Sequence, residues 1–260
     1  SHSAGQVEVT GGRFEGNVAN GTDTDDGGGG LYLRARAAIS NTQVIRNTAG
    51  RSGGGLYLRS SVALTNTQVI SNTAGQSGGG LYAREGVAAL NALFAANTAP
   101  DGAALYLYGY QYGYSRDQIL RHLTIASPTL ASGSAVYVND GTVNITNTII
   151  VSHTTGIRQT GGTLSEDYNL YFGNTTDINS TGGTLVTGTH SLHGQDPRFA
   201  DPVNDDYHLT VASPAVDAGT DVGATTDMDG DARPIGAGYD IGADEYTGIC
   251  FARLNDGLIY

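Results

Sequence analysis

Two nearly identical stretches lie 25 residues apart in the chain, NTQVIRNTAGRSGGGLYLR at 41–59 and NTQVISNTAGQSGGGLYAR at 66–84. Asn47, Asn72 and Asn97 follow one another at the same spacing of 25 residues. A fixed period in this range is typical of stacked repeat proteins, in which each unit buries its apolar face only against its neighbours. The sequence therefore predicts a solenoid in which one repeat forms one coil.

The repeat has the pattern of β-strands rather than of helices. Its apolar residues alternate in short runs that glycine and asparagine interrupt, and no window sustains a period of about 3.6 residues. In GGGLYLR, Leu56 and Leu58 share one parity while Tyr57 and Arg59 share the other, so a strand here directs the leucines inward. Three such short strands in each repeat predict an all-β protein, a right-handed parallel β-helix with coils of about 25 residues.

Composition and charge narrow the possible partners. The net charge of −12 opposes binding to nucleic acids and to anionic membrane surfaces. No apolar run approaches the roughly 18 residues of a membrane-spanning helix, so we expect no membrane insertion. All 13 basic residues are arginine, which excludes a catalytic lysine, and the single Cys250 permits no intramolecular disulfide.

The repeat pattern divides the chain into three parts. Residues 1–195 are predicted to form the coils of the β-helix. From Asp196 the sequence is less repetitive and carries most of the acidic excess, so residues 196–248 are predicted to form an irregular C-terminal cap of the same domain. Residues 249–260 follow as an extra β-prone segment.

The segment from 196 to 246 carries a resemblance to known proteins. Its motifs DPRF, NDDYHL, SPAVDAG, DMDGDARP and YDIGADEY resemble the closing segment of bacterial surface β-helix proteins of the choice-of-anchor type, including the anchor Q group. The upstream NTA and GGGLY repeats look like those of the same proteins and of polymorphic outer-membrane repeat proteins. The resemblance implies an extracellular or cell-surface location in a bacterium, and it implies little about activity.

The motif DMDGD suggests a calcium site. It places Asp227, Asp229 and Asp231 at alternate positions around Gly230, the opening spacing of calcium loops. An EF-hand would need a glutamate at the twelfth loop position, which is Gly238 here, so the motif is not an EF-hand.

Further ligands and an alternative remain open for this motif. Asp217, Asp240 or Asp244 could supply a missing oxygen atom, or Arg233 could lock the turn by pairing with one of the carboxylates without any metal. A second possible calcium site lies in the turn GTDTDDGGGG, where the candidate ligands are Asp23 and Asp25.

Two columns of asparagine follow from the 25-residue period. Stacked asparagine side chains at the corners of successive coils can form hydrogen-bonded ladders along the axis, so we expect a structural role for them. One column consists of Asn41, Asn66 and Asn91, and the other of Asn47, Asn72 and Asn97. His122 and His153 take positions in these columns and are expected to be corner residues as well.

The outward positions of the GGGLY strands form a possible ligand surface. Its members are Tyr32, Arg34, Tyr57, Arg59, Tyr82, Arg84, Tyr106 and Tyr137. Aromatic faces beside arginine suit carbohydrates or acidic polymers, whereas a tyrosine ladder also stabilises a parallel sheet without any ligand. The sequence favours the structural ladder and leaves polysaccharide binding as the alternative.

The distribution of acidic residues bears on catalysis. Polysaccharide lyases and glycoside hydrolases also use β-helix folds, and they need carboxylates placed along the central coils. Between Asp26 and Asp167 the only acidic residues are Glu85, Asp101, Asp117, Asp140 and Glu166. We therefore predict a non-catalytic structural or adhesive module, with a carbohydrate-active enzyme as the alternative and a carbohydrate-binding module as the third possibility.

The C-terminal segment suggests self-association. Its candidate assembly strand consists of Ile249, Cys250, Phe251, Ala252, Arg253 and Leu254. Such a strand can complete the open coil of another copy by β-augmentation, and head-to-tail addition of this kind produces filaments. The alternatives are that the segment folds back on its own domain or begins a tandem copy.

Overall fold

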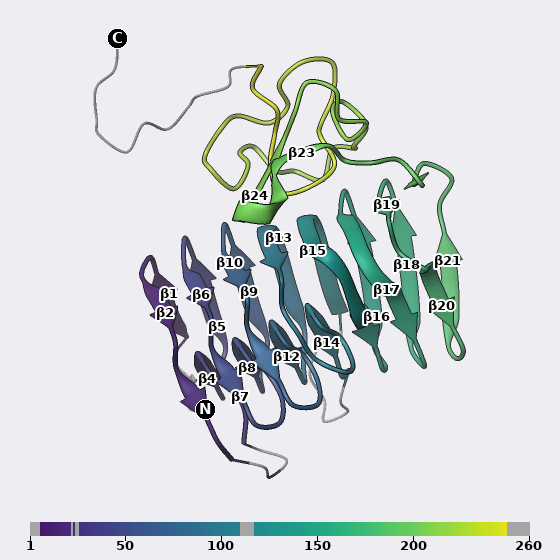
Figure 1. The fold of residues 1–260 in the computed structure, drawn as a ribbon. Helices are drawn as coiled ribbons and strands as arrows, with labels where there is room; N and C mark the ends of the chain where they lie inside the picture. Colours follow the sequence, from purple (N-terminus) through teal and green to yellow (C-terminus); the bar gives the residue numbers. More distant parts are fainter. Residues whose placement is uncertain (1–5, 22, 24–25, 110–116, 249–260) are drawn as a thin grey trace, which may run out of the picture.

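The computed structural model describes residues 6–21, 23, 26–109 and 117–248, so the predicted assembly strand and Asp25 lie outside the described residues. Parallel strands stack side by side along one axis, and an irregular segment lies across one flank of the stack (Figure 1). This arrangement confirms the predicted all-β parallel β-helix.

Each coil contributes a strand to three faces, which we number in chain order. Face 1 consists of β1 (Val7–Thr10), β5 (Ala37–Ser40), β9 (Val62–Thr65), the starts of β13 (Val87–Ala95) and β15 (Asp117–Val138), β16 (Thr142–Thr146), β18 (Thr163–Asp167) and β21 (Thr184–Thr187). Face 2 consists of β2 (Arg13–Glu15), β6 (Gln43–Ile45), β10 (Gln68–Ile70), later parts of β13 and β15, the start of β17 (Ile149–Gln159), β19 (Leu170–Phe172) and β22 (Leu192–His193).

Face 3 and a short connecting sheet complete the coils. Face 3 consists of β4 (Leu31–Leu33), β8 (Leu56–Leu58), β12 (Leu81–Ala83), β14 (Leu105–Leu107), the ends of β15 and β17, and β20 (Thr176–Ser180). Between faces 2 and 3 lie the two-residue strands β3 (Val18–Ala19), β7 (Thr48–Ala49) and β11 (Thr73–Ala74).

The register follows the sequence repeat where the repeat is clear and departs from it elsewhere. Gln68 pairs with Gln43, 25 residues earlier, and the later coils shorten, since Thr163 pairs with Thr142 and Thr184 pairs with Thr163. The segment 156–192, in which the repeat fades, therefore still forms coils of the same solenoid. Its turns are shorter while its strands keep the same three faces.

The corner between faces 1 and 2 explains the first asparagine column. Asn41, Asn66, Asn91, His122 and Asn147 all have left-handed backbone conformations there, with φ of 50°, 49°, 51°, 50° and 52°. Asparagine and histidine tolerate this conformation better than most residues with a side chain. The corner thus selects residue type through the backbone as well as through side-chain hydrogen bonds.

The interior of the solenoid is a continuous apolar core. The inward leucines of the GGGLY strands, such as Leu56, Leu58 and Leu81, are fully buried and pack with Phe94 and with aliphatic residues of faces 1 and 2. Burial of this kind is the main favourable term in folding, at roughly 25 cal/mol per Å² of apolar surface. Each coil buries its leucines only against the coils on either side.

Residues 196–248 pack against the outer side of face 2. They contain the antiparallel pair β23 (Phe199–Asp201) and β24 (Asp206–Leu209), with the short 3-10 helix η1 (Pro202–Asn204) between them. We call residues 196–248 the flank segment. It lies across several coils in Figure 1, whereas no described strand pairs with the outer edge of β21.

An outward apolar stripe on face 2 accounts for this position. The stripe is formed by Ile45, Ile70, Leu93, Ala95, Ala126, Ile149, Val151 and Leu170, and it packs with Tyr207, Leu209, Ala215 and Ile241 of the flank segment. Hydrogen bonds add specificity, because Asn91 Nδ2 donates to the Thr226 carbonyl at 2.7 Å and Asn147 Nδ2 to the Thr220 carbonyl at 2.7 Å. The flank segment therefore buries a surface that the coils alone would expose.

Candidate functional site

The second asparagine column forms a continuous ladder. Asn47 Nδ2 donates to Asn72 Oδ1 at 3.0 Å, and Asn72 Nδ2 donates to Asn97 Oδ1 at 3.0 Å. Asn72 Nδ2 also donates to the Val44 carbonyl at 2.8 Å, while Asn72 Oδ1 accepts the Asn47 backbone N–H at 2.9 Å. These three side chains are buried, and their hydrogen bonds link one coil to the next.

The first asparagine column lies nearer the surface and makes longer contacts. Asn66 Nδ2 lies 3.4 Å from Asn41 Oδ1, and Asn91 Nδ2 lies 3.3 Å from Asn66 Oδ1. Because hydrogen bonds of this length are weak, the left-handed backbone conformation is the stronger reason for asparagine here. Of the two histidines expected in the columns, His122 pairs with Asn147 at 3.0 Å, and the backbone N–H of His153 donates to Asn174 at 3.0 Å.

We expect His122 to make the stability of the coils sensitive to acid. Burial lowers the pKa of His122 to about 3, and the nearby Arg233 guanidinium lowers it in the same direction. The folded state thus keeps His122 neutral where the unfolded chain binds a proton, so stability falls as pH falls from about 6.5 towards 3. We expect His122→Asn, which restores the column residue, to lose less stability between pH 7 and about pH 4 than the parent protein.

Urea unfolding at the two pH values measures this difference. The substitution suits the left-handed backbone at position 122, so the stability at pH 7 should change little. An equal loss of stability on acidification in both proteins would show that His122 does not cause the acid sensitivity.

The tyrosines of face 3 form one stack. Tyr32, Tyr57, Tyr82, Tyr106 and Tyr137 have successive ring-centroid distances of 5.0, 4.9, 5.1 and 4.6 Å, with interplanar angles of 19° or less. Each inner ring therefore uses both faces against its neighbours. A sugar ring needs an open aromatic face, so this geometry favours the structural interpretation of the column.

Arginine side chains lie over both ends of the stack. The guanidinium carbon of Arg34 lies 5.5 Å from the centroid of Tyr32, and that of Arg158 lies 5.0 Å from the centroid of Tyr137. These distances are within the range of cation–π attraction. The rings at the two ends of the stack, Tyr32 and Tyr137, are thus each in contact with an arginine as well as with a tyrosine.

Arg59 and Arg84 lie beside the stack. Arg59 Nη1 is 3.4 Å from Tyr32 Oη, and the guanidinium carbon of Arg84 is 6.0 Å from the centroid of Tyr108. Polysaccharide binding at these arginines stays a prediction, one that would rely on charge and hydrogen bonds rather than on aromatic stacking.

The DMDGD motif closes on itself through one carboxylate. Asp227 is fully buried, and its Oδ1 accepts three consecutive backbone N–H groups at 2.9 Å, those of Asp229, Gly230 and Asp231. Its Oδ2 accepts the backbone N–H of Glu245 at 2.9 Å. Asp227 therefore holds the turn and anchors the end of the flank segment, while Asp231 is exposed.

The other candidate calcium ligands are also separated. Asp240 accepts the backbone N–H groups of Asp217 at 2.7 Å and Tyr246 at 2.6 Å, and burial raises the pKa of Asp240 to about 7. Asp23 is exposed in its turn, where its N–H donates to Asp26. Of the predicted ligands, the structure brings Asp229 and Asp244 together, whereas Asp227 and Asp240 bind backbone N–H groups. Calcium binding stays a prediction.

Arg233 locks the flank segment, with a partner that the sequence did not indicate. Its Nη1 pairs with Glu245 Oε2 at 2.7 Å, and both side chains are fully buried. Nη2 donates to the Gly242 carbonyl at 2.9 Å, and Glu245 Oε1 accepts the backbone N–H of Ile235 at 2.7 Å. The YDIGADEY motif thus supplies the counter-ion for the DMDGDARP motif.

A different trio of side chains does converge. His208, Asp229 and Asp244 each offer a ligand atom, and these atoms all lie within 4.8 Å of one another. Hydrogen bonds to Asp229 and Asp206 raise the pKa of His208 to about 10. The sequence indicated Asp229 and Asp244 of this trio as candidate metal ligands, but not His208. The alternation in NDDYHL, which places Asp206 and His208 on one side of a strand, was the available signal.

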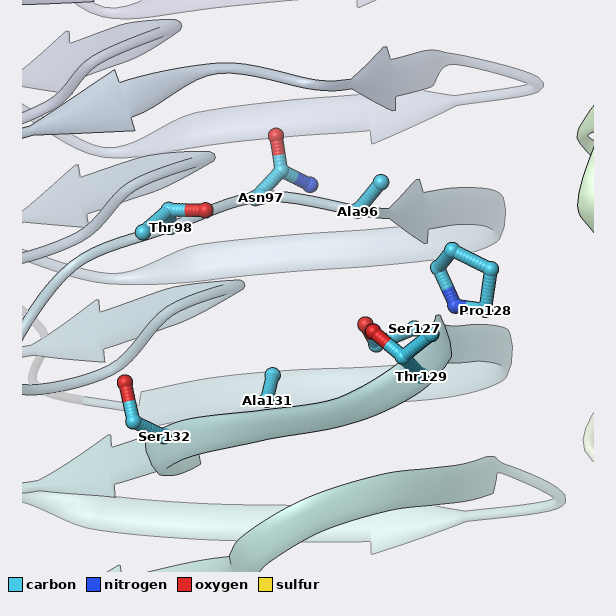
Figure 2. Close-up of a pocket in the computed structure, with 8 residues that line it drawn as sticks. All are labelled: Ala96, Asn97, Thr98, Ser127, Pro128, Thr129, Ala131 and Ser132. Carbon is cyan, nitrogen blue, oxygen red and sulfur yellow. The ribbon is translucent and has the colours of Figure 1, made fainter.

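A hollow between neighbouring coils is lined by no ionisable group. Figure 2 shows Asn97, Thr98, Ser127, Thr129 and Ser132 among the residues around this hollow of about 350 Å³, between neighbouring coils. The remaining lining residues are Ala96, Pro128 and Ala131. It offers hydroxyl and amide groups but no acid or base for catalysis.

Two adjacent carboxylates line a smaller hollow of about 220 Å³ on the last coils. Glu166 is buried and accepts from Ser191 Oγ at 2.8 Å and Tyr171 Oη at 3.2 Å, whereas Asp167 lies 3.0 Å from His190. Successive strand residues point to opposite faces of a sheet, so these carboxylates do not face each other across one bond. Glycoside hydrolysis by an opposed acid pair is therefore not favoured here.

Comparison with known proteins gives no assignment. No protein-family model matches the chain, and neither a curated protein nor a solved structure matches it. Among the described residues, none of the helical segments has the length and apolarity needed to span a bilayer. The function proposed below therefore relies on the geometry, and its cell-surface location on the resemblance of the motifs in 196–246.

Proposed function

We propose that this chain is a non-catalytic structural or adhesive β-solenoid module of a bacterial cell surface, and that it associates end to end. The carrying observation is that the repeated polar and aromatic side chains bind one another along the axis. The ladder of Asn47, Asn72 and Asn97 and the stack of five tyrosines use their bonding capacity within the fold. Such columns rigidify the solenoid, and they leave few hydrogen-bonding groups or open aromatic faces for a substrate.

The edge of the last coil supports end-to-end association. β21 pairs with β18 alone among the described strands, and all four of its residues are exposed. Leu185 pairs with the buried Leu164 and therefore occupies an inward position, whereas Val186 pairs with Ser165 and points outward. An open strand edge with an apolar inward residue is a template for another strand.

Replacing Leu185 by lysine should weaken this association. An inward charge at the open end would have to lose its water when another coil stacks on it, so we expect self-association to fall by at least about tenfold. Val186→Lys adds the same charge on the outward side and should associate like the parent protein. Sedimentation velocity over a range of concentrations measures both.

A parent protein that stays monomeric at high concentration would remove end-to-end association from the proposal. Equal association of the Leu185→Lys protein would mean that another surface is responsible. Deleting 249–260 separates two routes, since loss of association would favour donation of the predicted strand Ile249–Leu254, and unchanged association would favour direct pairing of coil edges.

A further inference from the structure

Three parts of the flank segment that are distant in sequence meet at one point. His208 comes from β24, Asp229 from the DMDGD turn, and Asp244 from the YDIGADEY motif. The turn is fixed by the buried Asp227, and β24 is fixed by its apolar contacts with face 2. The three side chains are therefore presented by elements that the fold itself holds in place.

The His208 ring is oriented as metal-binding histidines usually are. Its Nδ1 bonds the Asp206 carboxylate, and its Nε2 points to Asp229 Oδ2 at 2.9 Å. In metal sites, a carboxylate on one ring nitrogen commonly fixes the tautomer and leaves the other nitrogen to bind the ion. Asp206 would have this supporting role, with Nε2 as the ligand atom.

Asp244 brings a buried carboxylate to the trio. The residue is only 6% exposed, and one of its oxygens accepts the Leu209 N–H at 2.7 Å. The carboxylates of Asp227 and Asp229 lie near its charge, and His208 supplies a positive charge beside it. A divalent ion on His208 Nε2 would place a larger positive charge among these carboxylates.

We propose that His208, Asp229 and Asp244 bind a divalent transition-metal ion of the zinc class. Such an ion accepts imidazole nitrogen and carboxylate oxygen as ligands, whereas calcium takes six to eight oxygen ligands. The ion would link β24 to two loops of the flank segment, DMDGD and YDIGADEY. This inference goes beyond the proposed structural function and does not depend on end-to-end association.

Calorimetric titration of the intact chain with Zn²⁺ tests the site. We expect saturable binding of one ion and a higher melting temperature, because an ion that binds only the folded state stabilises it by mass action. Ca²⁺ at equal concentration should shift the melting temperature far less. Co²⁺ should give visible d–d absorption bands that report a nitrogen-containing ligand set.

Single substitutions in β24 and in the DMDGD turn distinguish binding at the trio from nonspecific attraction of a cation to acidic residues. His208→Gln and Asp229→Asn should abolish the saturable binding, and Asp206→Asn should weaken it by about 10–100-fold. Asp231→Asn removes the same charge from the same turn at an exposed position outside the trio, so it should bind like the parent protein. The melting temperature of each metal-free variant checks that it folds.

Three outcomes would overturn the proposal. These are the absence of saturable Zn²⁺ binding, equal binding by the His208→Gln protein, and equal losses in Asp229→Asn and Asp231→Asn. A stronger response to Ca²⁺ than to Zn²⁺ would also contradict it and would instead support the calcium site predicted from the motif.

Discussion

Replacing Arg233 by methionine is expected to destabilise the protein by about 3–5 kcal/mol, because it leaves a buried carboxylate without its counter-ion. Arg233 and Glu245 pair at 2.7 Å with both side chains fully buried. Burial opposes the charge of Arg233 and lowers its pKa, and the surrounding carboxylates compensate in part. Urea unfolding followed by circular dichroism measures the free-energy change.

The chain provides a matched control on its surface. Arg13 pairs with Glu15 at the same distance of 2.7 Å, but the two side chains are 48% and 36% exposed. Arg13→Met should therefore cost far less stability than Arg233→Met, since exposed pairs contribute little. Similar losses in both variants would contradict the view that the flank segment depends on a buried ion pair.

The double variant Arg233→Met with Glu245→Leu separates the two parts of the effect. Removing both charges eliminates the uncompensated carboxylate, so stability should recover towards the parent value. The backbone N–H groups of Ile235 and Asp240 would still lose an acceptor, which limits the recovery. No recovery would mean that these backbone bonds, rather than the charges, carry the stabilisation.

The fold was predictable because the period fixes most of its geometry. The 25-residue repeat places Gln43 beside Gln68 and Leu56 beside Leu81, as the structure shows. The pairing of β16 with β18 was harder to predict, because the spacing shortens to 21 residues and only a short motif, GGTL at 161–164 and 182–185, recurs at that spacing. There the strands persist while the turns lose the residues that made the repeat visible.

The outward stripe on face 2 was missed although the sequence contains its signal. In QVI, Val44 and Ile45 are adjacent and apolar, so both sides of that strand had to be covered. Val44 points into the core, and Ile45 packs with the flank segment. The alternation of residues along a strand predicted which side chains point into the core. It did not predict which segment covers the outward side chains of face 2.

The candidate metal ligands show the limit of motif spacing. The alternate aspartates of DMDGD suggested converging carboxylates, but Asp227 turns inward to bind backbone N–H groups and Asp229 turns to His208. The direction of each side chain depends on the left-handed turn at Gly230, with φ of 94°, and on contacts with β24. The contact of Asp229 with His208 and that of Asp227 Oδ2 with Glu245 join residues more than fifteen positions apart, and motif spacing does not predict such contacts.

Replacing Asn72 by alanine should cost about 2–4 kcal/mol, because it leaves buried polar groups without partners. Asn72 Oδ1 accepts the Asn47 N–H, and its Nδ2 donates to the Val44 carbonyl and to Asn97. Alanine supplies none of these bonds, and no water reaches the site in exchange, since Asn47 and Asn72 are fully buried. Urea unfolding measures the loss.

The first column supplies the control for this prediction. Asn66→Gly keeps the left-handed backbone and removes only contacts of 3.3 and 3.4 Å, so it should change stability by less than about 1 kcal/mol. Hydrogen exchange adds a local test, because the Asn47 amide should exchange faster in Asn72→Ala and remain protected in Asn66→Gly. Protection of the Asn47 amide in both proteins would show that its hydrogen bond to Asn72 does not stabilise that coil. Asparagine would then be required in this column for backbone conformation alone.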